Sequence, residues 1–133
     1  MVIITHNPEE TEQIAIELGR RLKGGEVLSL LGGLGAGKTT FAKGIAKALD
    51  ITDTVTSPTF TIMNSYKGRL NLYHYDMYRI QDEDELSELG IRDYLYSGGV
   101  SVIEWNKFDL SGLNVIHVTL EYLSENSRRI TIV

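Results

Sequence analysis

A glycine-rich segment, "GGLGAGKTT", lies between a run of apolar residues and a stretch with helical character, and it constrains this chain more than any other feature. Gly32, Gly37, Lys38 and Thr39 satisfy the pattern G-x-x-x-x-G-K-[ST]. Glycine lets consecutive backbone N–H groups turn inward around phosphate oxygens, and the N-terminus of the following helix adds partial positive charge. The segment therefore predicts a phosphate-binding loop (P-loop) and a nucleotide site.

The same pattern assigns chemistry to individual residues of the loop. Lys38 is expected to reach the β and γ phosphates, and the Thr39 hydroxyl is expected to ligate Mg²⁺. A nucleotide with Mg²⁺ is the expected ligand. The predicted nucleotide contacts in the loop are Gly33, Leu34, Gly35, Ala36, Gly37, Lys38, Thr39 and Thr40.

Hydrophobic periodicity around the loop predicts an α/β fold, a P-loop NTPase domain with a mixed β-sheet flanked by helices and a β-rich C-terminal half. We expect residues 1–133 to form a single domain. In the first helix, Ile14, Leu18 and Leu22 repeat every four residues and predict one buried stripe. The predicted elements are strand 2–5, helix 7–22, strand 27–31, a helix to about 49, a hairpin of 59–66 with 70–76, helix 82–90, irregular structure over 91–99, strand 100–104, and a hairpin of 114–123 with 128–133.

Composition excludes several classes of function. The chain has no cysteine and three scattered histidines, which argues against a disulfide framework or a transition-metal site. No apolar run approaches the length needed to span a bilayer, and the N-terminal residues do not resemble an export signal, so a cytoplasmic protein is expected. The net charge of −5 is unfavourable for gripping a nucleic acid backbone. Any nucleic acid should reach this protein through a partner.

Two acidic residues at predicted strand ends are candidates to complete the nucleotide site. Asp76 closes "LNLYHYD" and Glu104 closes "VSVIE". Open α/β sheets place ligands at the carboxyl ends of their strands, so both acids are expected at the edge that carries the loop. There they would hold Mg²⁺ or its water, or take part in hydrolysis. Trp105, the only tryptophan, follows Glu104 and should then report nucleotide binding.

The segment "SPTFT" places Ser57, Thr59 and Thr61 after the helix of the phosphate loop. P-loop switch proteins keep a mobile hydroxyl in such a segment, where it senses the γ-phosphate. The alternative is an ordinary loop that enters a strand, with Pro58 setting the entry. Arg79 is a further candidate, for neutralising charge in the transition state.

A second short motif supports a different interpretation. Asn106, Lys107 and Asp109 spell N-K-x-D, the pattern with which GTPases read guanine, and a small GTPase-like switch is therefore an alternative. The D-x-x-G element expected between the two motifs is missing, because the segment with that pattern begins only at Asp109. A third alternative is a module that binds nucleotide without hydrolysing it.

Several blocks together resemble one family, TsaE (formerly YjeE), the small P-loop ATPase of the bacterial machinery that makes threonylcarbamoyladenosine at position 37 of tRNA. They are "GGLGAGKTTFAKGIAKAL", "VTSPTFTIMNSY", "LYHYDMYRI", "ELGIRDYL" and "VIEW", in the family's order and spacing. One departure is Gly33, where we would expect a larger, often acidic residue.

The resemblance implies a weak ATPase that binds ATP or ADP with Mg²⁺, works with the TsaB and TsaD proteins and meets tRNA only through that complex. It implies that Lys38 contacts phosphate, that Thr39 and Glu104 hold Mg²⁺, and that Asp76 is a catalytic or water-orienting acid. The family also implies a switch-like segment around Thr59 and Thr61. Residues near the first helix contact the nucleotide in family members, which adds Thr11 and Glu12 as contacts here.

Overall fold

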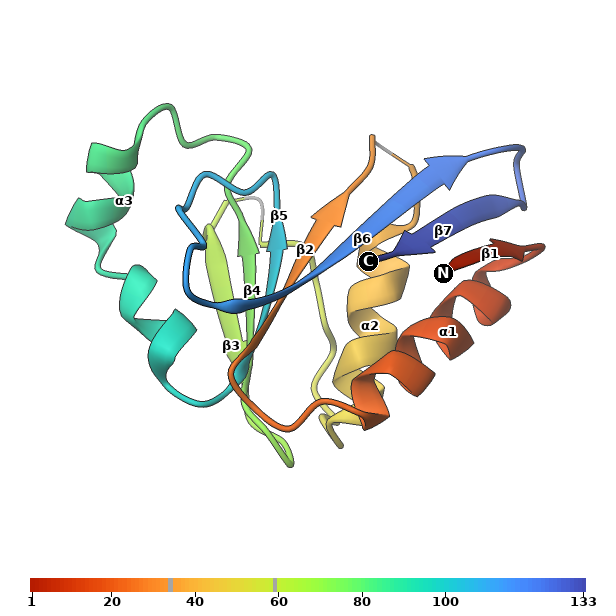
Figure 1. The fold of residues 1–133 in the computed structure, drawn as a ribbon, viewed down its shortest axis with the longest axis horizontal. Coiled ribbons are helices and arrows are strands. Elements are labelled where there is room, and N and C mark those ends of the chain that lie inside the picture. Colours follow the sequence, from red (N-terminus) through yellow and green to blue (C-terminus); the bar gives the residue numbers. More distant parts are fainter. Residues whose placement is uncertain (34, 59) are drawn as a thin grey trace.

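The computed structural model describes residues 1–33, 35–58 and 60–133. Strands and helices alternate in the first half of the chain, and strands dominate the last third (Figure 1). Within these ranges, no helix is both long and apolar enough to cross a bilayer. The elements are β1 (Val2–Thr5), α1 (Pro8–Arg20), β2 (Glu26–Leu31), α2 (Lys38–Ala48), β3 (Met63–Tyr66), β4 (Leu72–Asp76), α3 (Glu83–Leu89), the 3-10 helix η1 (Arg92–Tyr96), β5 (Val100–Glu104), β6 (Asn114–Tyr122) and β7 (Arg128–Ile132).

The strands join in one mixed sheet of order β1-β7-β6-β2-β5-β4-β3. The strand before the phosphate loop, β2, is central and runs parallel to β5 on one side and β6 on the other. Strand β4 is parallel to β5, whereas the outer pairs are antiparallel. Parallel strands point their carboxyl ends the same way, so β2, β4 and β5 all end at the edge that carries the loop.

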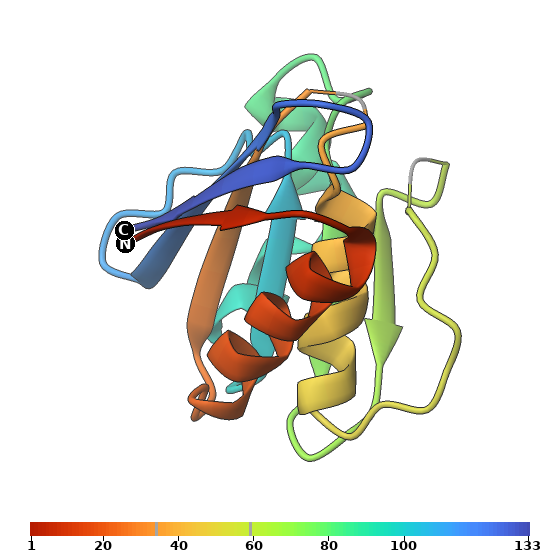
Figure 2. The same cartoon turned by 90° about the vertical axis from the view of Figure 1, so that its right-hand side faces the viewer.

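Two apolar layers cover the sheet. On one face, α1 and α2 lie side by side (Figures 1 and 2) and bury a cluster that includes Leu28, Phe41 and Ile45. On the other face, η1 and the segment after β5 cover a second cluster that includes Tyr75 and Ile103. Successive strand residues point to opposite faces, so each central strand contributes to both clusters. These layers make the central strands a rigid support for the loop.

The side of α1 that packs against α2 differs from the buried stripe predicted for this helix. Leu22 is buried, but Ile14 and Leu18 are only half-buried, and Ala15 lies at the centre of the contact. The reason is the close approach of the two helices: a Cβ added to Gly44 would lie 2.5 Å from the Cβ of Ala15. Small residues permit this approach, which moves the larger side chains to the flanks of the contact.

Two other segments also depart from expectation. The strand predicted over 59–66 begins only at Met63, because Ile62 has a positive φ of 68° and donates its N–H to the Pro58 carbonyl in a turn. The segment predicted to be irregular contains η1. By contrast, α3 follows the prediction: Asp82 caps it by accepting the Glu85 N–H.

Candidate nucleotide-binding site

The phosphate loop connects the end of β2 to the start of α2. Gly37 precedes the helix with a φ of 99°, a conformation that side chains rarely adopt. With no side chain at this position, the first turn of α2 has no side-chain cap. Its N–H groups therefore face the site, where they favour an anion together with the helix dipole.

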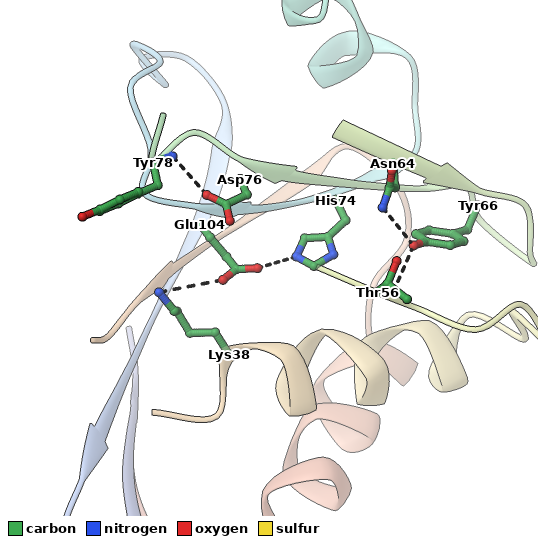
Figure 3. A network of polar contacts seen from close by, with 8 residues as sticks. All are labelled: Lys38, Thr56, Asn64, Tyr66, His74, Asp76, Tyr78 and Glu104. Atoms are coloured by element: carbon green, nitrogen blue, oxygen red, sulfur yellow. Dashed lines mark hydrogen bonds and ion pairs between the residues drawn. The ribbon is translucent and has the colours of Figure 1, made fainter. Parts of the chain in front are cut away.

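Lys38, the first residue of α2, is 7% exposed and lies between the Glu104 carboxylate and the Trp105 ring. Figure 3 shows the lysine facing Glu104. Its Nζ is 3.8 Å from Oε1 of Glu104 and 4.2 Å from the ring centroid of Trp105. Both contacts favour a cation, the first by charge and the second by the ring quadrupole. The ammonium is thus held at the mouth of the loop.

Asp76 and Glu104 are the last residues of β4 and β5, and they are paired in the parallel register. Both are largely buried, at 6% and 4% exposed. Asp76 Oδ1 accepts the N–H of Tyr78 at 3.0 Å, and the Glu104 carbonyl accepts the N–H of Met77 at 3.0 Å. The expectation that the two acids share the sheet edge of the loop is confirmed.

These groups line one hollow of about 360 Å³, within the size range of small-molecule sites. Most of the residues predicted from the phosphate motif, both acids and Trp105 contribute to it. The lining residues are Gly35, Ala36, Gly37, Lys38, Thr39, Thr40, Ser57, Asp76, Glu104, Trp105 and Arg128.

Not every predicted residue is found among those that line this hollow. Gly33 is not among the lining residues, and Leu34 and Thr59 lie outside the described residues. Thr61 is exposed and donates its hydroxyl to Oδ1 of Asn64 at 2.8 Å. Arg79 lies with its guanidinium 5.5 Å from the ring centroid of Phe60.

Thr11 and Glu12, the two nucleotide contacts that the family resemblance implies, lie at different places in the structure. Thr11 is buried and shares a 2.7 Å hydrogen bond between hydroxyls with Thr5; it borders a small cavity of about 40 Å³ beside Gly37 and Thr40. Glu12 instead forms an ion pair with Lys47 and borders a different hollow on the far part of α2. The structure brings Thr11, but not Glu12, to the loop.

Sequence reasoning missed Arg128, the first residue of β7. Its Nη2 donates to the carbonyl of Gly35 at 2.9 Å, and its Nη1 donates to the carbonyls of Ser124 and Ser127 at 2.7 and 2.9 Å. The guanidinium also lies 4.6 Å from the ring centroid of Tyr122. No local pattern marks this arginine, because its contact with the loop depends on the order of strands in the sheet.

His74 was also missed, although the sequence contains a signal for it. It lies two residues before Asp76 on a buried strand, so both side chains point to the same face. Its Nε2 lies 2.7 Å from Oε2 of Glu104. His74 and Glu104 therefore form one polar contact. The signal in the sequence is a polar residue two positions before a candidate acid on a buried strand.

Asn106 and Asp109, the residues that would read guanine, make hydrogen bonds in local turns. Asn106 accepts the N–H of Phe108 through Oδ1 and donates Nδ2 to the Phe108 carbonyl, both at 2.9 Å. Asp109 Oδ1 accepts the hydroxyl and the N–H of Ser111, and these bonds lower the pKa of the Asp109 carboxyl. Neither side chain is among those lining the hollow. The geometry gives the GTPase interpretation no support.

The donor set of the hollow fits magnesium bound together with phosphates. Among the described residues, no group of three or more His, Cys, Asp or Glu side chains could hold a metal alone. Mg²⁺ commonly takes one or two carboxylates and completes its shell with water and substrate phosphates. The carboxylates of Glu104 and Asp76 and the hydroxyl of Thr39 provide oxygen ligands of that kind.

Comparison with known proteins identifies the family of the chain. A family model described as "Threonylcarbamoyl adenosine biosynthesis protein TsaE" matches residues 5–130. The tRNA threonylcarbamoyladenosine biosynthesis protein TsaE of Treponema pallidum (strain Nichols) is 38% identical over 134 residues, covering 99% of both chains. The protein of the same name from Bacillus subtilis (strain 168) is 53% identical over 102 residues, covering 76% of this chain and 63% of that protein.

A solved structure agrees with these sequences. The crystal structure of Bacillus subtilis YdiB superposes with a TM-score of 0.79 at 37% identity, covering 99% of this chain and 83% of that one. Sequence and fold thus lead to the same group of proteins over nearly the whole chain. The chain belongs to the TsaE family of threonylcarbamoyladenosine biosynthesis proteins.

Proposed function

We propose that residues 1–133 act as one cytoplasmic ATPase domain that serves the synthesis of threonylcarbamoyladenosine in tRNA. The relatives carry this process in their names, and the family model carries it in its description. The observation that supports an ATPase is the convergence of Lys38, Asp76 and Glu104 on one hollow beside the phosphate loop. A cation for phosphate and two acids at strand ends are the groups that phosphoryl transfer to water requires.

Each group has a proposed role. The loop N–H groups and Lys38 hold the phosphates and stabilise the charge that develops on them. Thr39 and Glu104 would hold Mg²⁺, which would supply positive charge to offset the charge of the phosphates. Asp76 orients the attacking water or accepts its proton. Asp76 supports this role because it is largely buried beside Glu104 and lines the same hollow.

Further proposed contacts complete the site. The segment with Ser57, Thr59 and Thr61 responds to the γ-phosphate, a role supported by the place of Ser57 in the hollow. Thr11 contacts the nucleotide from α1, because it borders the cavity next to Gly37. Trp105 reports occupancy, since its ring lies against the Lys38 ammonium. Glu12 stays a prediction of the resemblance alone.

TsaB and TsaD are the proposed partners, as the family resemblance implies. A net charge of −5 agrees with tRNA being held by the complex rather than by this chain. The ATPase is expected to be weak alone and faster in the complex. The energy of ATP hydrolysis would then maintain the activity of TsaD, the transferase, and this chain would modify no substrate of its own.

Steady-state hydrolysis of ATP and GTP tests this function, measured for the chain alone and with purified TsaB and TsaD from the same organism. We expect ATP to be preferred and turnover to rise only when both partners are present. Lys38→Ala in the complex controls for contaminating ATPases. Preference for GTP without a partner effect would restore the guanine-reading interpretation, and no hydrolysis under any condition would favour a non-hydrolysing module.

A further inference from the structure

We propose that His74 is a positioning residue that orients the Glu104 carboxylate toward the metal site. The proposal rests on the proposed metal role of Glu104. His74 is fully buried on β4, and its Nε2 lies 2.7 Å from Oε2 of Glu104 (Figure 3). A carboxylate only accepts hydrogen bonds, so Nε2 carries the hydrogen.

The two carboxylate oxygens of Glu104 have different partners. Oε2 of Glu104 is held by the imidazole, whereas Oε1 faces the Lys38 ammonium at 3.8 Å. Figure 3 shows the carboxylate between these two side chains. With Oε2 anchored from within the sheet, rotation about the end of the glutamate side chain is restricted. Oε1 is therefore the oxygen presented to the hollow.

The other ring nitrogen argues against a purely structural role. Nδ1 of His74 is buried without a hydrogen-bond partner among the described residues. An unpaired buried nitrogen destabilises a fold, and its neighbours on this face, Leu72 and Val102, belong to the apolar cluster. An apolar side chain would pack here without that penalty, so the imidazole is best explained by what its Nε2 does for Glu104.

The consequence is a selective effect on metal binding. Partners that orient a metal ligand typically contribute about 10- to 100-fold to metal affinity. Loss of the His74 contact should therefore weaken the metal in the protein–ADP complex by about tenfold or more. ADP affinity in EDTA should change by less than about twofold, because the loop N–H groups and Lys38 do not depend on His74.

The test compares two amides at position 74. A glutamine places its amide nitrogen near the position of Nε2, whereas an asparagine amide ends near Nδ1 and does not reach Glu104. Mn²⁺ affinity of the protein–ADP complex is measured by water proton relaxation, and ADP affinity in EDTA by calorimetry. We expect His74→Asn to lose metal affinity and His74→Gln to retain most of it.

Tyr75→Phe is the matched control. Tyr75 is the next residue on β4, is also fully buried, and donates its hydroxyl to the Ile91 carbonyl on the opposite face of the sheet. This variant removes the hydroxyl hydrogen bonding of a buried residue on the same strand without touching Glu104, so Mn²⁺ affinity should stay unchanged. If His74→Asn does not fold, His74→Leu replaces it, because leucine is apolar and similar in bulk.

Glu104→Gln, measured in parallel, separates this proposal from the function on which it rests. If Glu104→Gln weakens Mn²⁺ binding while His74→Asn or His74→Leu leaves it unchanged, His74 does not position the ligand. Equal loss of metal and of metal-free ADP binding in these His74 variants would also overturn the proposal. If Glu104→Gln itself leaves Mn²⁺ affinity unchanged, the metal role of Glu104 fails first.

Discussion

The ammonium of Lys38 lies 3.8 Å from the Glu104 carboxylate, so the candidate phosphate-binding cation and the candidate metal ligand offset each other's charge within the hollow. A hydrogen bond to a charged group contributes about 1.5–3 kcal/mol, and each 1.4 kcal/mol is about tenfold in affinity. Lys38→Ala should thus weaken nucleotide binding by about tenfold to a hundredfold, measured by calorimetry with ATP or ADP. Lys43→Ala, an exposed lysine on the same helix, is the control; near-normal binding by Lys38→Ala would contradict the assignment.

Asp76→Asn should slow hydrolysis more than it weakens binding. The asparagine retains an oxygen for the Tyr78 N–H but loses the negative charge that orients or deprotonates water. Groups in such a role contribute about 10²- to 10⁴-fold to rate, so kcat should fall by at least about 100-fold with nucleotide affinity nearly unchanged. Single-turnover hydrolysis and calorimetry check both quantities. Asp84→Asn, on the exposed side of α3, is the control, and a loss confined to binding would refute the catalytic role.

Arg128→Ala should loosen the phosphate loop. The Arg128 guanidinium donates a hydrogen bond to the carbonyl of Gly35, which lies 93 positions earlier in the sequence. Loss of the side chain removes this charged hydrogen bond from the loop backbone. We expect nucleotide affinity to fall by about tenfold. Arg129→Ala is a close control, because Arg129 pairs with Glu121 on the exposed surface. Equal affinities in the two variants would show that the loop does not need Arg128.

Gly44→Ala should destabilise the fold despite the better helix propensity of alanine. The added Cβ would lie 2.5 Å from both the Ala15 Cβ and the Glu12 carbonyl oxygen, so α1 and α2 must move apart. Overpacking of this kind costs about 1–3 kcal/mol, against a gain of about 1 kcal/mol from propensity. Urea unfolding measures the difference. A Lys43→Ala control should be nearly neutral, and a Gly44→Ala protein of unchanged or higher stability would contradict the close packing.

Local sequence predicted the elements that build the edge of the site. The loop between β2 and α2, the ends of β4 and β5, and the cap of α3 by Asp82 all follow the expected pattern. Each depends on neighbouring residues: a run of apolar positions, a set of glycines, or an acid three residues before the N–H that it caps. The same local reasoning placed β3 too early, because the turn at Ile62 depends on its bond to Pro58.

Short motifs were less informative where side chains had other partners. Asn106 and Asp109 spell a guanine-reading pattern, yet their polar atoms bond to the backbone of Phe108 and Ser111. Glu12 belongs to a helix that approaches the loop, yet it pairs with Lys47. Sequence spacing cannot distinguish a free polar atom from an occupied one.

The sequence alone determined a glycine-rich loop between a strand and a helix, with the pattern that predicts phosphate binding, because that pattern lies within nine neighbouring residues and depends on glycine conformations and helix polarity. The tertiary structure decided which distant groups complete the loop. The strand order brings Glu104 beside Lys38, His74 beneath Glu104, and Arg128 onto Gly35. These contacts join residues 30 to 93 positions apart, and tertiary packing rather than local sequence fixes distances over such separations.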